Sequence, residues 1–110
     1  TEMPHLLVAG ATGSGKSIFI NTLLTTWLYT KNPHELNLAI VDPKMIELAH
    51  YNKIPHLLGQ VLVNTDEAKD FFVEAVNEMS RRYGMLSDLG SRDIISFNKT
   101  IQKSSKICSD

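Results

Sequence analysis

The chain has 110 residues, of which 11 are lysine or arginine and 12 are aspartate or glutamate, for a formal net charge of −1. Its length limits it to one domain, its apolar fraction of 43% excludes a disordered composition, and its balanced charge gives no indication of nucleic-acid binding. One cysteine excludes an internal disulfide, and no run approaches the roughly 20 apolar residues of a membrane span. Because the sequence starts directly before a predicted strand, we expect it to be a piece of a longer protein.

The first predicted elements are a buried strand over residues 5–9 and a helix from Lys16 to Tyr29. The glycine-rich loop between them, residues 10–17, fits the phosphate-binding pattern G-x-x-x-x-G-K-[ST] at every fixed position. Strand, glycine loop and helix in this order are the context in which the pattern indicates a nucleotide site. The predicted nucleotide-binding residues are Gly10, Ala11, Thr12, Gly13, Ser14, Gly15, Lys16 and Ser17.

The residue types in this loop suit a nucleoside triphosphate with a divalent cation. Glycines let the backbone approach an anion closely, and the loop N–H groups with the positive helix end bind the phosphates. Lys16 is the predicted catalytic residue, because its charge would lie on the β- and γ-phosphates. The hydroxyl of Ser17 is the predicted ligand of Mg²⁺. We therefore expect ATP and Mg²⁺ as cofactors.

A second predicted strand over residues 36–41 ends at Asp42, and strand, helix and strand together predict an α/β fold with parallel strands. Asp42 has two interpretations. An apolar strand that ends in aspartate is typical of the carboxylate that holds Mg²⁺ in P-loop ATPases, known as Walker B. However, Pro43 stands where many hydrolysing ATPases place a glutamate, which favours an aspartate that caps a turn. Neither Asp42 nor Lys44 receives a catalytic role.

The remaining pattern predicts a short helix over residues 45–51, a strand over residues 60–63 and a long amphipathic helix over residues 64–89. One further short helix includes Ile94 and Ile101, and residues 99–110 have the composition of a mobile polar tail or linker. The histidines have no metal-binding spacing, and the basic residues Arg81, Arg82 and Arg92 are interpreted as a solvated helix end rather than a DNA or phosphate contact.

Beyond the loop, several stretches form a more specific combination. They are Met3–Gly10 running into Thr12–Ser17, Ile40–Lys44 with Glu47-Leu48, Tyr51 with Ile54–Leu58, Glu78-Met79 with Arg81–Tyr83, and Arg92–Ile94 with Phe97-Asn98. In this combination the chain resembles the FtsK/SpoIIIE family of bacterial DNA translocases. The resemblance extends from Met3 to about Asn98, which is nearly the whole chain.

The resemblance implies a RecA-like P-loop NTPase, a three-layer α/β/α fold with a mostly parallel sheet, present here only in part. Residues 1–98 would be the N-terminal part of the motor domain, and residues 99–110 the tail. The implied function is ATP-dependent translocation of double-stranded DNA for chromosome segregation at cell division or sporulation. The implied assembly is a hexameric ring. The parent would carry a membrane anchor elsewhere, so that this segment is a cytoplasmic domain of an inner-membrane protein and does not itself contact the membrane.

Two departures from the family pattern qualify these expectations. Phe19 replaces a small residue, and nothing after Leu89 reads as a Walker B strand. We therefore expect the chain alone to supply the phosphate-binding half of the site and to be inactive in hydrolysis. Two alternatives stay open for the function, a motor of a related conjugation or protein-export system, and a nucleotide-binding assembly module without hydrolysis.

Overall fold

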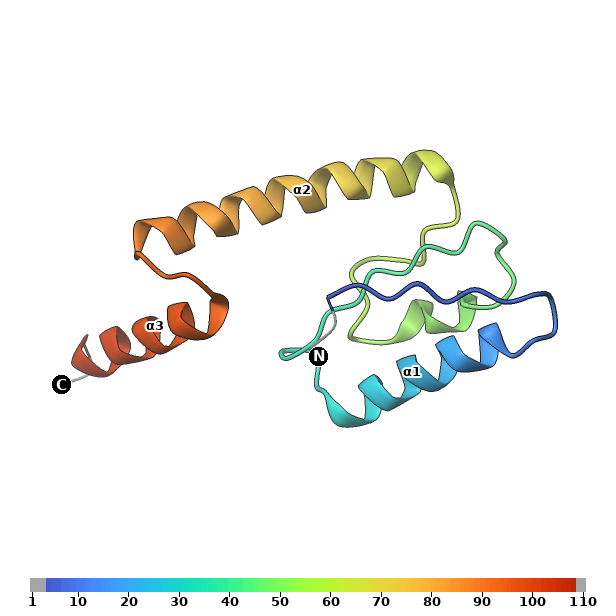
Figure 1. The fold of residues 1–110 in the computed structure, drawn as a ribbon, viewed down its shortest axis with the longest axis horizontal. Helices are drawn as coiled ribbons and strands as arrows, with labels where there is room; N and C mark the ends of the chain where they lie inside the picture. The colour runs from blue at the N-terminus through green and yellow to red at the C-terminus, as the bar shows by residue number, and fades with distance from the viewer. Residues whose placement is uncertain (1–3, 109–110) are drawn as a thin grey trace. The chain divides into compact units, whose positions relative to one another are not determined.

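The computed structural model describes residues 4–108 and divides into two compact units, residues 1–65 and residues 66–110 (Figure 1). Met3, where the resemblance starts, and residues 109–110 of the predicted tail lie outside the described residues. The elements in chain order are the helix α1 (Lys16–Thr30), the 3₁₀-helix η1 (Ala49–Lys53), and the helices α2 (Thr65–Asp88) and α3 (Ile94–Cys108). Each unit is described by itself.

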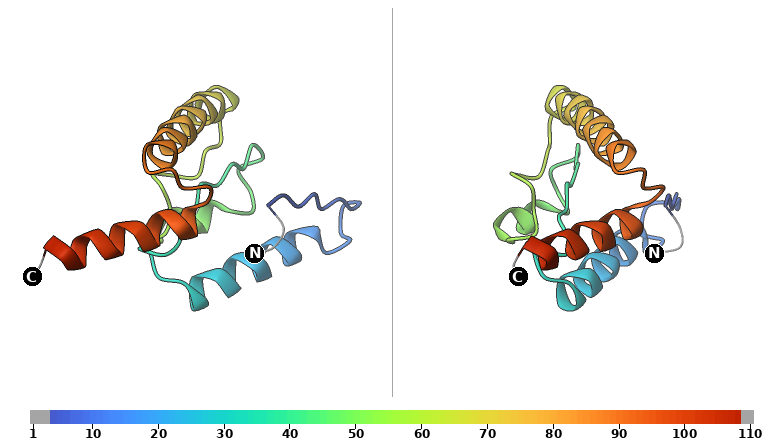
Figure 2. Two further views of the ribbon diagram at one scale, coloured as in Figure 1. Left: turned by 60° about the vertical axis from the view of Figure 1, so that its left-hand side comes forward. Right: turned by 90° about the vertical axis from the view of Figure 1, so that its left-hand side faces the viewer.

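The core of the N-terminal unit lies between α1 and the segments that follow it (Figures 1 and 2). Leu24 of α1 packs with buried residues of the later segments, each at most 9% exposed, namely Leu38, Ile40, Tyr51 and Val61. Partly buried apolar residues surround this group, including Trp27. The apolar stripe expected on α1 therefore faces the core as the sequence indicates.

The predicted strands are not formed as strands within residues 4–108, so the structure does not show a sheet among the described residues. Residues 36–42 do run parallel to residues 56–62, but only through the two isolated bridges Leu38–Leu57 and Val41–Leu62. Their hydrogen bonds are short, with Leu58 N–H to the Leu38 carbonyl at 2.8 Å and Leu62 N–H to the Ile40 carbonyl at 2.9 Å.

Two features interrupt the ladder between these bridges. Residues 58–61 lie between the bridged positions on one side and only residues 39 and 40 on the other, so the longer side must bulge. Gly59 takes φ of 76° there, and the Val61 N–H turns to the Asn52 side chain at 2.7 Å. Residues 5–9 have no strand assignment either, because none of the described segments forms a ladder with them.

The helix α1 confirms the predicted helix from Lys16 to Tyr29. It ends where Lys31 turns to an extended conformation, ahead of Asn32 and Pro33. On its exposed face three hydroxyls donate to the carbonyl four residues earlier at 2.8 Å, those of Thr22, Thr26 and Thr30.

The short helix predicted over residues 45–51 was wrong in place and type. A 3₁₀-helix, η1, forms at Ala49–Lys53 instead, and residues 43–48 form a turn. In this turn the Asp42 carboxylate accepts the backbone N–H groups of Lys44, Glu47 and Leu48.

In the C-terminal unit, α2 confirms the long helix predicted over residues 64–89. Acidic residues in its first turn favour the positive helix end. Its last turn closes with Gly90 at φ of 62°, the Gly90 N–H on the Ser87 carbonyl at 3.0 Å and the Ser91 N–H on the Leu86 carbonyl at 2.9 Å. This arrangement is a Schellman-type cap with glycine in the left-handed position.

A short loop leads to α3, which replaces most of the predicted mobile tail (Figure 1). Asp93 caps the helix, with its Oδ1 accepting the Ser96 N–H at 2.8 Å, and this hydrogen bond lowers the pKa of the Asp93 carboxyl. Farther along, the Thr100 and Ser104 hydroxyls donate to carbonyls four residues earlier. Residues 99–108, predicted as part of a polar tail or linker, are thus helical, and their small hydroxyl residues bond to their own helix. Within the described part of the chain, no helix is long and apolar enough to cross a membrane.

Candidate functional site

The loop over residues 10–17 turns at two glycines and then enters α1. Gly13 and Gly15 have φ of 80° and 93°, in the left-handed region that glycine reaches without steric cost. The Ser14 N–H donates to the Ala11 carbonyl at 3.1 Å, and the Phe19 N–H donates to the Gly15 carbonyl at 2.9 Å as the first bond of the helix. The N–H groups of the first helical turn precede this ladder and point out of the helix end. The loop therefore gathers backbone donors and the positive helix end where an anion would bind.

A hollow of about 310 Å³ lies at this end of α1. Its lining comprises Ala11, Thr12, Gly13, Gly15, Lys16, Ser17, Ile18, Lys44 and Glu47. Of the predicted nucleotide-binding residues, Gly10 and Ser14 do not line it. The Cα of Gly10 instead lies against the Ser14 side chain, so that a Cβ there would collide with the Ser14 hydroxyl. The structure thus brings most of the predicted loop residues around one concave surface.

The turn that follows the buried segment also reaches this hollow. Asp42 is 8% exposed, and its carboxylate accepts the N–H groups of Lys44 at 3.3 Å, Glu47 at 3.2 Å and Leu48 at 3.1 Å. Burial alone would raise the pKa of Asp42, but the backbone N–H groups outweigh it and lower the pKa. Asp42 is thus the cap of a turn, as its favoured interpretation predicts, and its carboxylate is occupied by backbone donors.

Lys44 and Glu47 also line the hollow, although the sequence analysis assigns neither of them a role in the site. The Ser17 hydroxyl donates to the Glu47 Oε2 at 2.7 Å, across thirty positions of sequence. Serine hydroxyl and carboxylate oxygens are the hard donors that Mg²⁺ prefers, so this pair fits the metal expected with a nucleotide. The sequence signal for these two residues was the Asp42-Pro43-Lys44 motif, with Glu47 three positions after Lys44, at the end of the apolar segment over residues 36–41.

A second layer of contacts holds the first turn of α1. Asn21 donates from Nδ2 to the Ser17 carbonyl at 3.0 Å, and its Oδ1 accepts the hydroxyl of Tyr51 at 2.7 Å. Tyr51 lies in η1 and is only 6% exposed. The core of the N-terminal unit is thereby connected through one amide to the residue that ends the phosphate-binding pattern.

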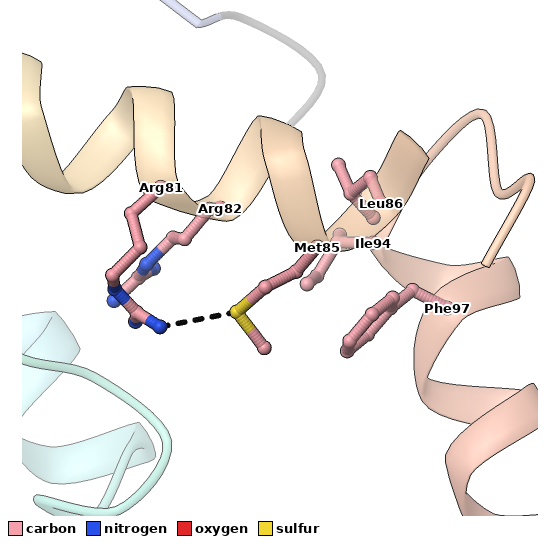
Figure 3. Close-up of a pocket in the computed structure, with 6 residues that line it drawn as sticks. All are labelled: Arg81, Arg82, Met85, Leu86, Ile94 and Phe97. Atoms are coloured by element: carbon pink, nitrogen blue, oxygen red, sulfur yellow. Dashed lines mark hydrogen bonds between the residues drawn. The ribbon is translucent and has the colours of Figure 1, made fainter. Parts of the chain in front are cut away.

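The C-terminal unit has a different hollow, of about 220 Å³, with a mostly apolar lining (Figure 3). Figure 3 shows Arg81 and Arg82 on one side of it and the Phe97 ring on the other. Both guanidinium groups bond to the Glu78 carboxylate at 2.7 Å, and these hydrogen bonds lower the pKa of Glu78 to about 2. The two arginines therefore belong to an exposed helix-surface network, in line with the interpretation of a solvated helix end. Its lining contains no glycine and therefore no glycine loop for phosphate.

Comparison with known proteins places this geometry in a family. A model described as FtsK/SpoIIIE family matches residues 1–109. The chain belongs to the FtsK/SpoIIIE family. Membership implies a P-loop NTPase fold, in agreement with the loop and helix described above. The predicted resemblance is confirmed, while the sheet of such a fold is present among the described residues only as the two bridges.

The relatives of this FtsK/SpoIIIE chain are much longer proteins. It is 48% identical over 102 residues to "DNA translocase SpoIIIE" of Bacillus subtilis, which is 93% of this chain and 13% of that protein. It is 46% identical over 106 residues to "DNA translocase FtsK" of Listeria monocytogenes, 96% of this chain and 14% of that protein. It is 49% identical over 102 residues to "DNA translocase FtsK" of Staphylococcus epidermidis, which is 93% of this chain and 13% of that protein. The sequence thus corresponds to a small part of each relative.

Proposed function

We propose that this chain is the phosphate-binding part of an ATP-driven motor that translocates double-stranded DNA. The observation that carries the proposal is the hollow lined by the glycine loop, Lys16 and Ser17 at the N-terminus of α1, in a chain of the FtsK/SpoIIIE family. The names of the relatives, all DNA translocases, support DNA as the polymer that is moved.

Each residue of the hollow has a role in this proposal. The N–H groups of the loop and of the first helical turn bind the phosphates, and the Lys16 ammonium stabilises the charge on the transferred phosphoryl group. Lys44 adds a second ammonium group to the lining of the hollow. The Ser17 hydroxyl is a ligand of the Mg²⁺ that accompanies ATP and neutralises phosphate charge when bound.

For the parent protein we propose a RecA-like three-layer α/β/α motor domain with a mostly parallel sheet, completed by chain outside this sequence. The motor assembles as a hexameric ring around DNA and serves chromosome segregation at cell division or sporulation. The segment lies in the cytoplasm, and a membrane anchor elsewhere in the parent holds it at the inner membrane. Hydrolysis needs a further carboxylate beyond these residues, so the 110-residue chain alone binds ATP without turnover.

Steady-state ATP turnover with and without duplex DNA tests the proposal, on the longest natural chain that contains this sequence. We expect turnover that DNA accelerates, loss of both with Lys16→Ala, and no effect of Lys53→Ala, an exposed lysine in η1 outside the hollow.

Other outcomes of this assay select other functions. Turnover that ignores DNA would favour a motor for conjugation or protein export. ATP binding that never leads to turnover would favour an assembly module. Turnover that survives Lys16→Ala unchanged would contradict the assigned site.

A further inference from the structure

We propose that Glu47 supplies a carboxylate to the metal side of the nucleotide site, next to the Ser17 hydroxyl. The inference rests on the proposed function, because it concerns the Mg²⁺ that accompanies the bound nucleotide. It adds to the site a residue from the turn after Asp42, far from the glycine loop in sequence.

The Ser17 and Glu47 side chains lie at the spacing of neighbouring metal ligands. The Ser17 Oγ lies 2.7 Å from the Glu47 Oε2. Neighbouring oxygen ligands of an octahedral Mg²⁺ with bonds of about 2.0–2.1 Å lie about 2.9 Å apart, so the pair already has nearly the spacing of two adjacent ligands. The same spacing accommodates a carboxylate that bonds to a metal-bound water. Mg²⁺ sites in phosphate-transferring enzymes usually combine one or two carboxylates with water and substrate phosphate.

The hollow combines positive groups with one carboxylate. The phosphate-binding loop, Lys16 and Lys44 all favour an anion, whereas Glu47 in the same lining would repel a triphosphate. A divalent cation beside Glu47 removes this conflict, because both the carboxylate and the phosphates then face positive charge. Glu47 is therefore better matched to a metal–nucleotide complex than to the nucleotide alone.

The backbone at Glu47 is held in place by hydrogen bonds to Asp42. Its own N–H donates to the Asp42 carboxylate at 3.2 Å, and the next N–H, that of Leu48, donates at 3.1 Å. Asp42 itself ends the buried segment of the core. The backbone that carries Glu47 is thus tied to the core, while the Glu47 residue itself stays exposed at the hollow. Asp42 acts here as a positioning residue, as outer-shell partners of metal ligands do.

The test is the dependence of nucleotide affinity on metal, measured on the longest natural chain that contains this sequence. The Kd for ATP is determined by calorimetry in EDTA and again in Mg²⁺, and the ratio of the two values is compared between wild type and Glu47→Gln. Removing the carboxylate should leave the Kd in EDTA unchanged or tighter and should reduce the enhancement by Mg²⁺ about tenfold. Mn²⁺ binding to the ADP complex, followed by electron paramagnetic resonance, should weaken by a similar factor.

Two variants control for charge and for reach. Glu74→Gln removes a carboxylate from the exposed surface of α2 and should leave both Kd values unchanged. Glu47→Asp keeps the negative charge but shortens the side chain by one methylene. Its Kd for ATP in EDTA should match that of wild type, while part of the enhancement by Mg²⁺ should be lost.

The outcomes separate the two levels of the proposal. If Glu47→Gln shifts both Kd values by the same factor, or shifts neither the ratio nor the Mn²⁺ affinity, Glu47 is only a structural partner of Ser17 and the inference is overturned. If the wild type binds no ATP in either condition, the proposed function itself fails and the inference falls with it.

Discussion

Replacement of Tyr51 by phenylalanine tests the connection between the core and the phosphate-binding helix. The change removes one oxygen from a side chain that is 6% exposed and that donates to the Asn21 Oδ1 at 2.7 Å. The ring keeps its packing in the core cluster, so no cavity forms. The effect should therefore isolate one hydrogen bond.

The magnitude follows from what the deletion leaves behind. A hydrogen bond of this kind contributes about 0.5–1.5 kcal/mol, and leaving its half-buried acceptor without a donor adds to the loss. We expect Tyr51→Phe to reduce the free energy of unfolding by about 1–2 kcal/mol. For a unit of this size each kcal/mol lowers Tm by about 4–8 °C.

Urea unfolding followed by tryptophan fluorescence measures the loss in the correct unit. Trp27 is the only tryptophan of the chain, and it packs against the core cluster of the N-terminal unit. Tyr29→Phe is the matched control, because Tyr29 is 89% exposed and should change little. A double-mutant cycle with Asn21→Ala should give a coupling of about 0.5–1.5 kcal/mol. A coupling near zero, or an equal effect of Tyr29→Phe, would refute the reasoning.

Three further predictions concern backbone strain and pH. Gly15→Ala should lower the free energy of unfolding, measured in urea, by about 1–2 kcal/mol and weaken ATP binding, because φ of 93° is strained with a Cβ. Gly84→Ala, in the interior of α2 with open space at its Cβ, should instead raise the free energy of unfolding by up to about 1 kcal/mol. Changes of the same sign in the two variants would contradict this prediction. Because the pKa of Asp42 is lowered, the ionised carboxylate stabilises the folded N-terminal unit above the ordinary value of 3.8, and this stabilisation is lost as pH falls through the lowered value. In Asp42→Asn, the free energy of unfolding, followed by Trp27 fluorescence, should therefore depend less on pH in the acid range. The ionised Glu78 carboxylate should stabilise α2 above pH 4.5, and this stabilisation should be lost as pH falls through about 2. The far-UV circular dichroism of Glu78→Gln should lack this pH dependence. The same pH dependence in wild type and Glu78→Gln would contradict the role of Glu78.

The helices were predictable because their signals are local. The stripe of α1, the acidic first turn of α2 and Gly90 after it set boundaries that the structure reproduces to within one residue. The predicted strands depend on ladders between distant segments, and here Gly59 and the Asn52 side chain interrupt the ladder. The same limit applies to α3, where side-chain hydrogen bonds stabilise a helix whose composition suggests a linker.

The candidate site divides along a similar line. The glycine loop with Lys16 and Ser17 is contiguous, so its pattern alone indicates the hollow. Glu47 reaches Ser17 from a turn in which three N–H groups bond to the Asp42 carboxylate, and no spacing rule encodes that path. Composition and hydrophobic periodicity describe residues that are close in sequence. The Ser17–Glu47 hydrogen bond instead depends on the tertiary fold, which brings together residues thirty positions apart.

The threonines of α1 have a consequence for how that helix meets other surfaces. Thr22, Thr26 and Thr30 already direct their hydroxyl protons to carbonyls of their own helix. A hydroxyl whose donor is used internally loses little when water is removed, in contrast to one that needs a solvent partner. Dehydration of the exposed face of α1 therefore carries a smaller penalty than its polar sequence suggests.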